Sequence, residues 1–212
     1  MDEPLRITLL YSANIAGDLA LLPRLYTFLR RLQAPERQNT LLLDLGRSCS
    51  AAILHCRETG GRSTLIVLDG MGYHAANIAG ALDRENRAKL AAIVTMGLVD
   101  ETADWLYHVP PIHDPSIRVR LRPRDDGARL QIILAPAAST RIEGTALYLQ
   151  AVGAGHVGEA VVDLRGAPCL LRACVHPMPP DTPPNPSIAG AVEFVEAEAR
   201  FFARQAGQTR TT

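Results

Sequence analysis

The chain has 212 residues and equal numbers of basic and acidic side chains, 22 of each. Because no net charge attracts polyanions, we do not expect nucleic acid or an anionic membrane surface as a partner. Hydrophobic residues make up 47% of the chain, enough to bury a core, which excludes a mainly disordered protein. Four cysteines are too few for a disulfide scaffold. We therefore expect a globular cytoplasmic protein with reduced thiols and no signal peptide.

Strands and helices alternate in the first half of the chain. Nearly continuous apolar runs predict strands that are covered on both faces, over residues 6–12, 40–45 and 91–98. Between the first two strands, apolar residues at helical spacing predict a helix over residues 20–32, with Asp18 as its N-cap. Residues 63–71 fit either a strand or a helix.

A short helix is expected after the second strand. Ser48 is a suitable N-cap, and the helix would run through Cys56 and end at Gly60. On a regular helix Cys49 and Cys56 would lie about 10 Å apart along the axis. A disulfide requires Cα atoms within roughly 7 Å, so these two cysteines would pair only if the helix were broken.

Strands dominate the second half. Arginines alternate with apolar residues over 117–123, and the turn residues 125–127 predict a hairpin to a returning strand at 129–134. Further strands are expected at 145–152 and 160–164. The arginines of the first strand share one face, which we interpret as a solvated, charge-protected edge. They are Arg118, Arg120, Arg122 and Arg124.

The other cysteines and histidines form no recognisable metal motif. Cys169 and Cys174 are five positions apart in a strand-like segment, so we expect them to face opposite ways as core residues. The histidines without ligand spacing are His74, His108, His113, His156 and His176.

The pattern predicts an α/β domain with a mixed sheet or two stacked sheets. This domain is expected to cover residues 1–176. Six of the ten residues 177–186 are proline, which predicts an extended linker. A helix over 187–206 carries apolar residues on one face and is expected to pack on the same domain.

Five short blocks follow these elements in order. They are residues 12–17 (SANIAG), 42–48 (LLDLGRS), 71–75 (MGYHA) with 79–82 (AGAL), 90–98 (LAAIVTMGL) and 149–158 (LQAVGAGHVG). In this order they resemble the N-terminal metallophosphoesterase domain of bacterial 5′-nucleotidases and cyclic phosphodiesterases. The resemblance implies a calcineurin-like phosphoesterase fold, with two stacked mixed β-sheets flanked by helices. It also implies that strands 6–12 and 40–45 are neighbours, because the loops that follow them must converge.

The same resemblance argues against the family's chemistry. Such enzymes hold two metal ions with carboxylates, histidines and an asparagine. The matching positions here carry Asn14, Ala16, Arg47, Gly80 and Ala81. The family's later histidine block falls near residues 135–139, which contain no histidine. We therefore expect no metal, no cofactor and no dinuclear hydrolase, but a degenerate protein of the fold, a pseudoenzyme.

Arg47 nevertheless stands at a position where it can serve binding. A guanidinium at the turn between a strand and a helix can hold phosphate in a bidentate manner. Asn14, Arg47 and Ser48 are therefore candidates for binding a small anion. In the alternative interpretation Arg47 pairs with an acid such as Asp44 and fills the space left by the metals.

Residues 49–63 contain the densest chemistry. His55-Cys56-x5-Arg62 resembles the signature of cysteine-dependent phosphatases, in which a thiolate attacks phosphorus and the arginine binds phosphoryl oxygens. The expected helix argues against this, because Cys56 would lie at its C-terminal end, where the dipole disfavours a thiolate. Cys49, beside Arg47 at the other end, is the candidate for redox chemistry. Both cysteines can also be ordinary, partly buried thiols.

These patterns lead to two hypotheses. In the first, the chain is a non-catalytic, metal-free protein of the 5′-nucleotidase-like fold that binds a small anionic ligand or a protein partner. In the second, it is a thiol-dependent enzyme that uses Cys49 or Cys56. The stretch around these cysteines also resembles a group of nucleotidase-like bacterial proteins in which selenocysteine can replace a cysteine.

Overall fold

The computed structural model describes residues 6–33, 39–107 and 117–209, and within them two mixed sheets. The six-stranded sheet has the order β11 (Cys169–Pro177), β10 (His156–Asp163), β1 (Arg6–Ser12), β2 (Thr40–Asp44), β3 (Ala75–Asn77) and β4 (Gly97–Val99). The five-stranded sheet has the order β5 (Trp105–Leu106), β6 (Ile117–Arg120), β7 (Leu130–Ala137), β9 (Ala146–Gln150) and β8 (Arg141–Glu143). The predicted pair of stacked mixed sheets is therefore confirmed.

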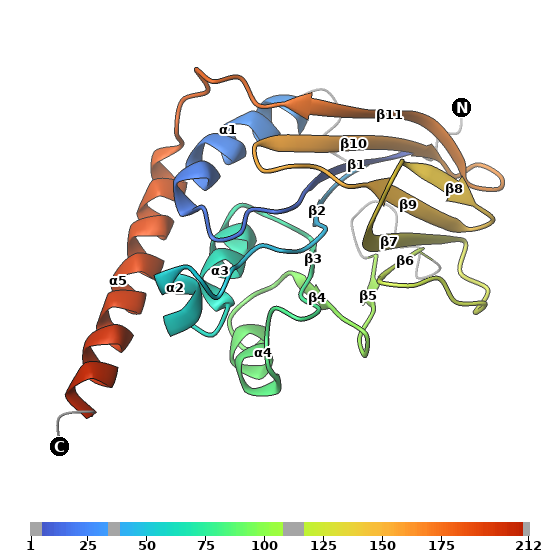
Figure 1. Ribbon diagram of the computed structural model, residues 1–212. Helices are drawn as coiled ribbons and strands as arrows, with labels where there is room; N and C mark the ends of the chain where they lie inside the picture. Colours follow the sequence, from blue (N-terminus) through green and yellow to red (C-terminus); the bar gives the residue numbers. More distant parts are fainter. Residues whose placement is uncertain (1–5, 34–38, 108–116, 210–212) are drawn as a thin grey trace.

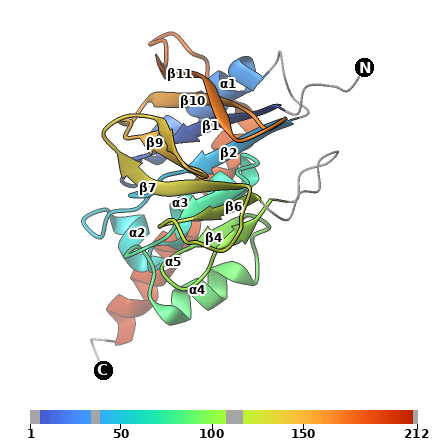
Figure 2. The same ribbon diagram turned by 90° about the vertical axis from the view of Figure 1, so that its right-hand side faces the viewer.

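The helices lie against the six-stranded sheet, and the five-stranded sheet covers its other face (Figures 1 and 2). They are η1 (Leu19–Leu21, a 3-10 turn), α1 (Leu22–Gln33), α2 (Leu54–Glu58), α3 (Arg62–Gly70), α4 (Arg84–Ala91) and α5 (Pro186–Thr209). One apolar cluster fills the space between the two sheets, and a second lies between the six-stranded sheet and the helices. Alternate residues of β1 supply both clusters, since Leu9 faces the first and Leu10 the second.

β1 and β2 are parallel neighbours, as the resemblance implied. Leu9 is opposite Leu41 and Tyr11 is opposite Leu43, and all four side chains are buried. The helix expected between the strands is present as η1 and α1, and Asp18 caps it by accepting a hydrogen bond from the amide of Leu21 at 3.2 Å.

Several expected elements differ from the structure. Residues 63–71 form helix α3, which buries Leu65 and Leu68. Most of the strand expected at 91–98 is a turn that follows the end of helix α4 at Ala91, and Asp83 caps this helix by accepting from the amide of Asn86 at 2.7 Å. Only β4 remains of that strand.

The hairpin expected around residues 125–127 is wrong, because β6 and β7 pair in parallel. The interpretation of β6 as a solvated edge is also wrong, since β5 pairs with its free side. Arg120 is only 1% exposed and forms ion pairs with Asp104 and Asp126, each at 2.8 Å. Of the four arginines, Arg120 is thus buried in an ion-pair cluster, whereas Arg122 and Arg124 are exposed.

Helix α5 packs along α1, α2 and α3 and extends beyond them (Figure 1). Ile188, Val195 and Ala199 are buried on one face, as the spacing predicted. The guanidinium of Arg24 donates hydrogen bonds to the carbonyls of Pro179, Pro180 and Thr182. These bonds attach the proline-rich segment to α1.

Within the described residues, no helix has the length and hydropathy needed to cross a bilayer. His108 and His113 lie outside the described residues.

Gly158 gives a direct test of the packing between the sheets. A Cβ atom at this glycine would lie 2.0 Å from Cζ of Tyr11, whose ring is 1% exposed. We expect Gly158→Ala to lower the free energy of unfolding by about 1–3 kcal/mol, as overpacking does. Gly166→Ala is the matched control, because nothing lies within 4 Å of its added Cβ. Equal stability of the two variants in urea unfolding would contradict this packing.

Candidate functional site

The loops that follow β1 and β2 run side by side. The amides of Asn14, Ala16 and Gly17 donate to the carbonyls of Gly46, Arg47 and Ser48 at 3.0, 2.8 and 2.9 Å. Asn14, Ala16 and Arg47 have positive φ values of 58°, 54° and 58°. Left-handed backbone at residues other than glycine costs free energy and persists where the surroundings enforce it, often at functional sites. The loops converge as the resemblance implied.

The positions that match the family's metal ligands do not offer a metal site. The side-chain amide of Asn14 donates to the carbonyl of Val152 at 2.7 Å. Ala16 and Arg47 are exposed, and their side chains are a methyl group and a cation. Gly80 and Ala81 lie on the loop after β3 and have no side-chain donor atom. This donor set does not fit a dinuclear centre, which needs several anionic or imidazole ligands.

Ser48 and Asp44 form a buried hydrogen bond with each other. The Ser48 hydroxyl and the Gly46 amide both donate to Oδ2 of Asp44, the second at 3.1 Å. Asp44 is fully buried, and its Oδ1 has no hydrogen-bond partner among the described residues. Burial raises the pKa of Asp44 to about 7, although the bonds from Ser48 and Gly46 act to lower it. Of the three candidates for binding an anion, Asn14 and Ser48 thus point their donors at the protein, and Arg47 alone is exposed.

The helix expected over residues 49–56 is wrong. The Ser48 hydroxyl bonds to Asp44 instead of capping a helix, and α2 begins only at Leu54. The intervening residues turn back, so the Cα atoms of Cys49 and Cys56 lie 5.6 Å apart and a disulfide joins the two sulfurs. The expectation of four reduced thiols is therefore wrong for this pair, and the physical reason is the break in the helix.

Three loops meet at this disulfide: the first follows β1, the second follows β2 and the third follows β3. A Cβ atom on Gly17, in the first loop, would lie 2.9 Å from Sγ of Cys56. A Cβ atom on Gly61 would lie 2.5 Å from the carbonyl oxygen of Ala81, in the third loop. Both glycines have positive φ, at 88° and 84°. Larger residues would push the loops apart, so glycine permits this close approach.

His55, on α2, is buried and bonds to the first loop and to α3. Its Nε2 is 2.8 Å from the carbonyl oxygen of Gly17, and its Nδ1 is 2.7 Å from Oγ of Ser63. Because a carbonyl only accepts, Nε2 carries the proton and Nδ1 accepts from Ser63. The sequence alone indicated no role for His55 beyond its place in the His55-Cys56-x5-Arg62 pattern. The buried imidazole fixes α2 against the first loop.

The two sulfurs lie at the N-terminal end of α3. Sγ of Cys49 is 3.3 Å from Oγ1 of Thr64 and 3.6 Å from Oγ of Ser63. Cys49 is half-buried, whereas Cys56 is 2% exposed. If the disulfide is reduced, the Thr64 hydroxyl and the helix dipole favour the thiolate of Cys49, whereas the Ser63 hydroxyl is already used by His55.

The structure does not form the phosphate loop of cysteine-dependent phosphatases. Cys56 lies within α2, and the amides after it are bonded inside the protein. The amides of Gly60, Gly61 and Arg62 donate to the carbonyls of Arg57, Cys56 and Thr59. The guanidinium of Arg62 also donates to the carbonyl of Thr59, at 2.9 Å. The three amides and Nε of Arg62 therefore do not point at a common phosphoryl position, which argues against the phosphatase interpretation.

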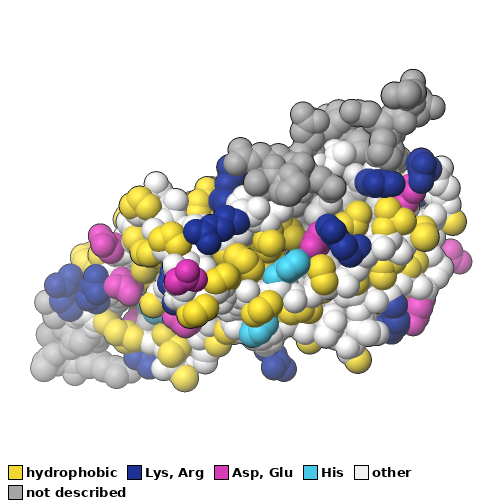
Figure 3. All heavy atoms as spheres, turned by 90° about the horizontal axis from the view of Figure 1, so that it is seen from above, with side chains coloured by type: hydrophobic (Ala, Val, Ile, Leu, Met, Phe, Trp, Pro, Cys, Tyr) yellow, Lys and Arg dark blue, Asp and Glu magenta, His cyan; other side chains and the backbone are white. Residues whose placement is uncertain are grey.

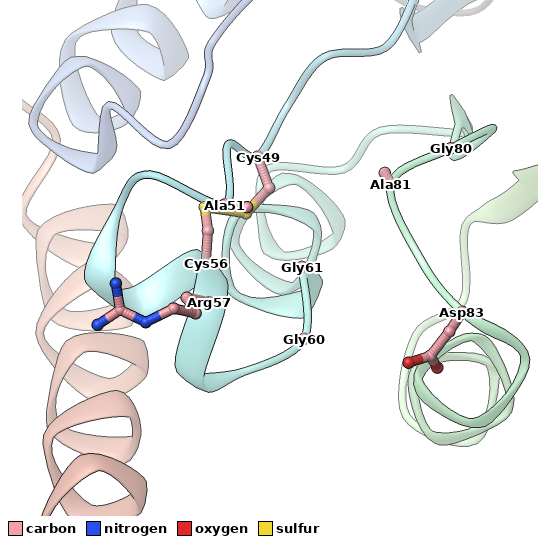
Figure 4. Close-up of a pocket in the computed structure, with 9 residues that line it drawn as sticks. All are labelled: Cys49, Ala51, Cys56, Arg57, Gly60, Gly61, Gly80, Ala81 and Asp83. Atoms are coloured by element: carbon pink, nitrogen blue, oxygen red, sulfur yellow. A yellow bond between two sulfur atoms is a disulfide. The ribbon is translucent and has the colours of Figure 1, made fainter.

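A cavity of about 290 Å³ opens beside the disulfide (Figure 4). Its lining joins the second loop with α2, the α2–α3 turn and the third loop. The lining residues are Cys49, Ala51, Cys56, Arg57, Gly60, Gly61, Gly80, Ala81 and Asp83. Asp83 faces it from the start of α4, and Arg57 extends away from Asp83 (Figure 4). The cavity thus contains two positions that match family metal ligands, Gly80 and Ala81.

Comparison with known proteins identifies the fold. No protein-family profile matches the sequence, and no curated protein matches it. Solved structures match over most of the chain at very low identity. The sulfate thiohydrolase SoxB of Thermus thermophilus has a TM-score of 0.64 and 11% identity, over 93% of this chain and 62% of SoxB. The calcineurin-like phosphoesterase YfkN of Bacillus subtilis has a TM-score of 0.60 and 9% identity, over 95% of this chain and 100% of that one.

A third similar structure is the NAD nucleotidase NadN of Haemophilus influenzae. Its TM-score is 0.55 at 10% identity, over 99% of this chain and 61% of NadN. The chain thus spans about three fifths of the length of NadN and of SoxB. These likenesses show that the chain has the calcineurin-like phosphoesterase fold and resembles 5′-nucleotidases in structure.

Because Asp44 is buried, the pH dependence of the free energy of unfolding tests the structure of the second loop. Native Asp44 keeps its proton up to about pH 7, whereas the unfolded chain loses it near the ordinary value of 3.8. Between these values the native state binds more protons, so its free energy of unfolding falls as pH rises, by up to about 1.4 kcal/mol per pH unit. We expect Asp44→Asn to flatten this part of the profile in urea unfolding. Exposed Asp181→Asn should leave it unchanged, and an unchanged profile for Asp44→Asn would contradict the assignment.

Proposed function

We propose that the chain is a protein of the phosphoesterase fold whose three loops are metal-free, and that it binds a ligand in the cavity there and does not hydrolyse phosphoesters with two metals. The observation that carries this proposal is the convergence of three loops whose positions matching the family's ligands carry no metal-binding carboxylate or imidazole. Among the described residues two clusters of three potential ligands occur, Cys49 with His55 and Cys56, and Glu159 with Cys174 and His176. Neither contains a position that matches a family ligand.

The size of the cavity and one accessible cation at its edge support a small anionic ligand, although Asp83 also lines it. A volume of about 290 Å³ lies near the lower end of the range for small-molecule sites. Arg57 lines the cavity and its side chain is 57% exposed; its Nε pairs with Glu58 at 3.1 Å, and we propose that the two terminal nitrogens of the guanidinium bind the anion. Because one structural neighbour is named as an NAD nucleotidase, we propose a nucleotide as the ligand, with no role for nucleic acid or a membrane. A protein partner at the same loops is the alternative.

Titration calorimetry with adenosine 5′-monophosphate tests this function. We expect saturable binding, and chromatography should recover the nucleotide intact after incubation with Mn²⁺. Arg57→Ala should weaken binding by about tenfold or more, the value of a charge-assisted hydrogen bond. Arg200→Ala is the control, because Arg200 lies on α5 with a similarly exposed side chain, at 59%. Release of phosphate with Mn²⁺, or absence of binding to both adenosine 5′-monophosphate and NAD, would contradict the proposal.

The disulfide supports a second candidate function, thiol–disulfide exchange. Its sulfurs face a cavity, and one of them, on Cys49, is half-buried rather than enclosed. We propose a cytoplasmic location, where disulfides are usually transient and redox-linked. Closing a loop with a sequence separation of 7 stabilises the fold by roughly 2–3 kcal/mol in the chain-entropy description. Reduction therefore loosens the three loops without unfolding the domain.

The greater exposure of Cys49 determines which of the two sulfurs an external thiol attacks. The thiolate of an external dithiol attacks Sγ of Cys49, the bond between the two protein sulfurs breaks, and Cys56 leaves as a thiolate that takes up a proton. The second thiol of the reductant then attacks the other sulfur of the reductant, which is bonded to Cys49 in the mixed disulfide, and this attack releases Cys49. The protein gains two electrons, and the dithiol becomes a cyclic or intramolecular disulfide.

Alkylation of the reduced protein tests the thiol chemistry. After reduction with dithiothreitol, iodoacetamide should modify Cys49 faster than Cys56, because Cys49 is more exposed and has the Thr64 hydroxyl as a donor. Thr64→Val keeps the shape but removes one donor, and it should slow the reaction of Cys49. Thr27→Val is the control, since this hydroxyl bonds within α1 to the carbonyl of Pro23. Peptide mass spectrometry showing Cys56 modified first would contradict this assignment.

A further inference from the structure

A second cluster of chemically active side chains lies on β10 and β11, and it shares no residue with the three loops. Oε2 of Glu159 is 2.7 Å from Nε2 of His176 and 3.2 Å from Sγ of Cys174. The sulfur and the imidazole nitrogen are also 3.2 Å apart. One carboxylate oxygen, one thiol sulfur and one imidazole nitrogen thus form a compact triangle.

Strand register explains why the three side chains meet. Cys174 and His176 are two positions apart on β11, so they point to the same face of the sheet. Glu159 is directly opposite Cys174 in the antiparallel pair, so its side chain joins them on that face. The sequence shows no ligand spacing for His176, because the third member of the cluster lies on another strand.

A bulge also changes the expected positions of the two free cysteines. The register between β10 and β11 shifts between Val161 and Val162. It places Cys169 opposite Asp163 and Cys174 opposite Glu159, which are an even number of positions apart on β10. The prediction that the two cysteines face opposite ways is therefore wrong, as is the prediction of a buried Cys169, which is exposed.

The residues around Glu159 stabilise its ionised carboxylate. The side chain of Glu159 is only 10% exposed, and Oε1 accepts a hydrogen bond from the guanidinium of Arg172. Burial acts to raise the pKa of Glu159, but bonds from His176, Cys174 and Arg172 hold it below its ordinary value. Arg172 thereby fixes the carboxylate and leaves Oε2 directed at the other two groups, as outer partners of metal ligands do.

We propose that Glu159, Cys174 and His176 form a binding site for one zinc-like transition-metal ion. Zn²⁺ takes sulfur, nitrogen and carboxylate ligands at about 2.0–2.3 Å, which places tetrahedral ligand atoms roughly 3.3–3.6 Å apart. The two separations of 3.2 Å to the sulfur need to open by about 0.1–0.4 Å, and the 2.7 Å between Oε2 and Nε2 by about 0.6–0.9 Å, to reach these values. Mixed sulfur, nitrogen and oxygen ligands favour zinc and its neighbours over Mg²⁺ or Ca²⁺.

Binding requires a defined release of protons. Burial and the neighbouring Glu159 raise the pKa of the Cys174 thiol, so the metal displaces its proton to solvent and takes the thiolate. The proton on Nε2 of His176 moves to Nδ1, and the imidazole binds in its neutral form. Glu159 binds through Oε2 while Arg172 retains Oε1. The imidazole is 31% exposed, so a fourth position can take water. Histidine side chains are visible at the surface on the side of β11 (Figure 3).

Cobalt substitution tests the site without any assay of activity. The protein is stripped with a chelator, kept free of reductant so that Cys49 and Cys56 stay paired, and titrated with Co²⁺. We expect one equivalent to bind, with the near-ultraviolet thiolate-to-cobalt band and the visible absorption of tetrahedral Co²⁺, and Zn²⁺ should displace it. Cys174→Ser should abolish the thiolate band, and His176→Ala should weaken binding by more than about 100-fold, beyond the cost of losing an outer partner.

Two controls separate this site from the rest of the protein. Cys169→Ser, on the same strand, should leave the spectrum unchanged. The double variant Cys49→Ser with Cys56→Ser should also keep the band, which distinguishes the site from the loops and from the proposed function there. Circular dichroism establishes that each variant is folded. Absence of a thiolate band in the wild-type protein, or its persistence in folded Cys174→Ser, would overturn the proposal.

Discussion

The parallel pairing of β1 with β2 is the constraint on which the rest of the site depends. It brings the ends of both strands to one edge, where backbone hydrogen bonds join the loop of Asn14 and Ala16 to the loop of Gly46 and Arg47. The pairing places Gly17 against Cys56 and lets His55 bond to the first loop. Once these contacts form, the chain after Ser48 turns back on itself, and the two cysteines come within bonding distance.

The fold and the chemistry of this edge are separable. Convergence of the loops comes from strand order and backbone bonds, which do not depend on the side chains that would hold metals. The side chains decide the chemistry, and here they are an amide turned toward Val152, a methyl group, an exposed guanidinium and a disulfide. A calcineurin-like fold therefore persists while the site offers a cavity and a pair of sulfurs. We place metal-binding capacity elsewhere, on β10 and β11.

Local patterns in the sequence were sufficient for the elements that pack on both faces. The apolar runs at 6–12 and 40–45 predicted β1 and β2, and Asp18 marked the start of η1 and α1. The resemblance supplied the adjacency of the strands. The other predictions failed because of side-chain contacts that local sequence patterns do not record. Ser48 matches an N-cap, but Asp44, already buried, takes its hydroxyl. Glu159 meets Cys174 through strand register, which no local spacing records.

The central claim is that the three loops of this fold hold a disulfide and a cavity where a dinuclear centre would otherwise lie. Anomalous diffraction from crystals soaked in Mn²⁺ tests it most directly, because it locates metal ions irrespective of activity. We expect no anomalous peak between residues 13–17, 46–49 and 79–82, and continuous density between the sulfurs of Cys49 and Cys56. Two peaks about 3.5–4 Å apart among these loops, the spacing of a two-metal site, would contradict it.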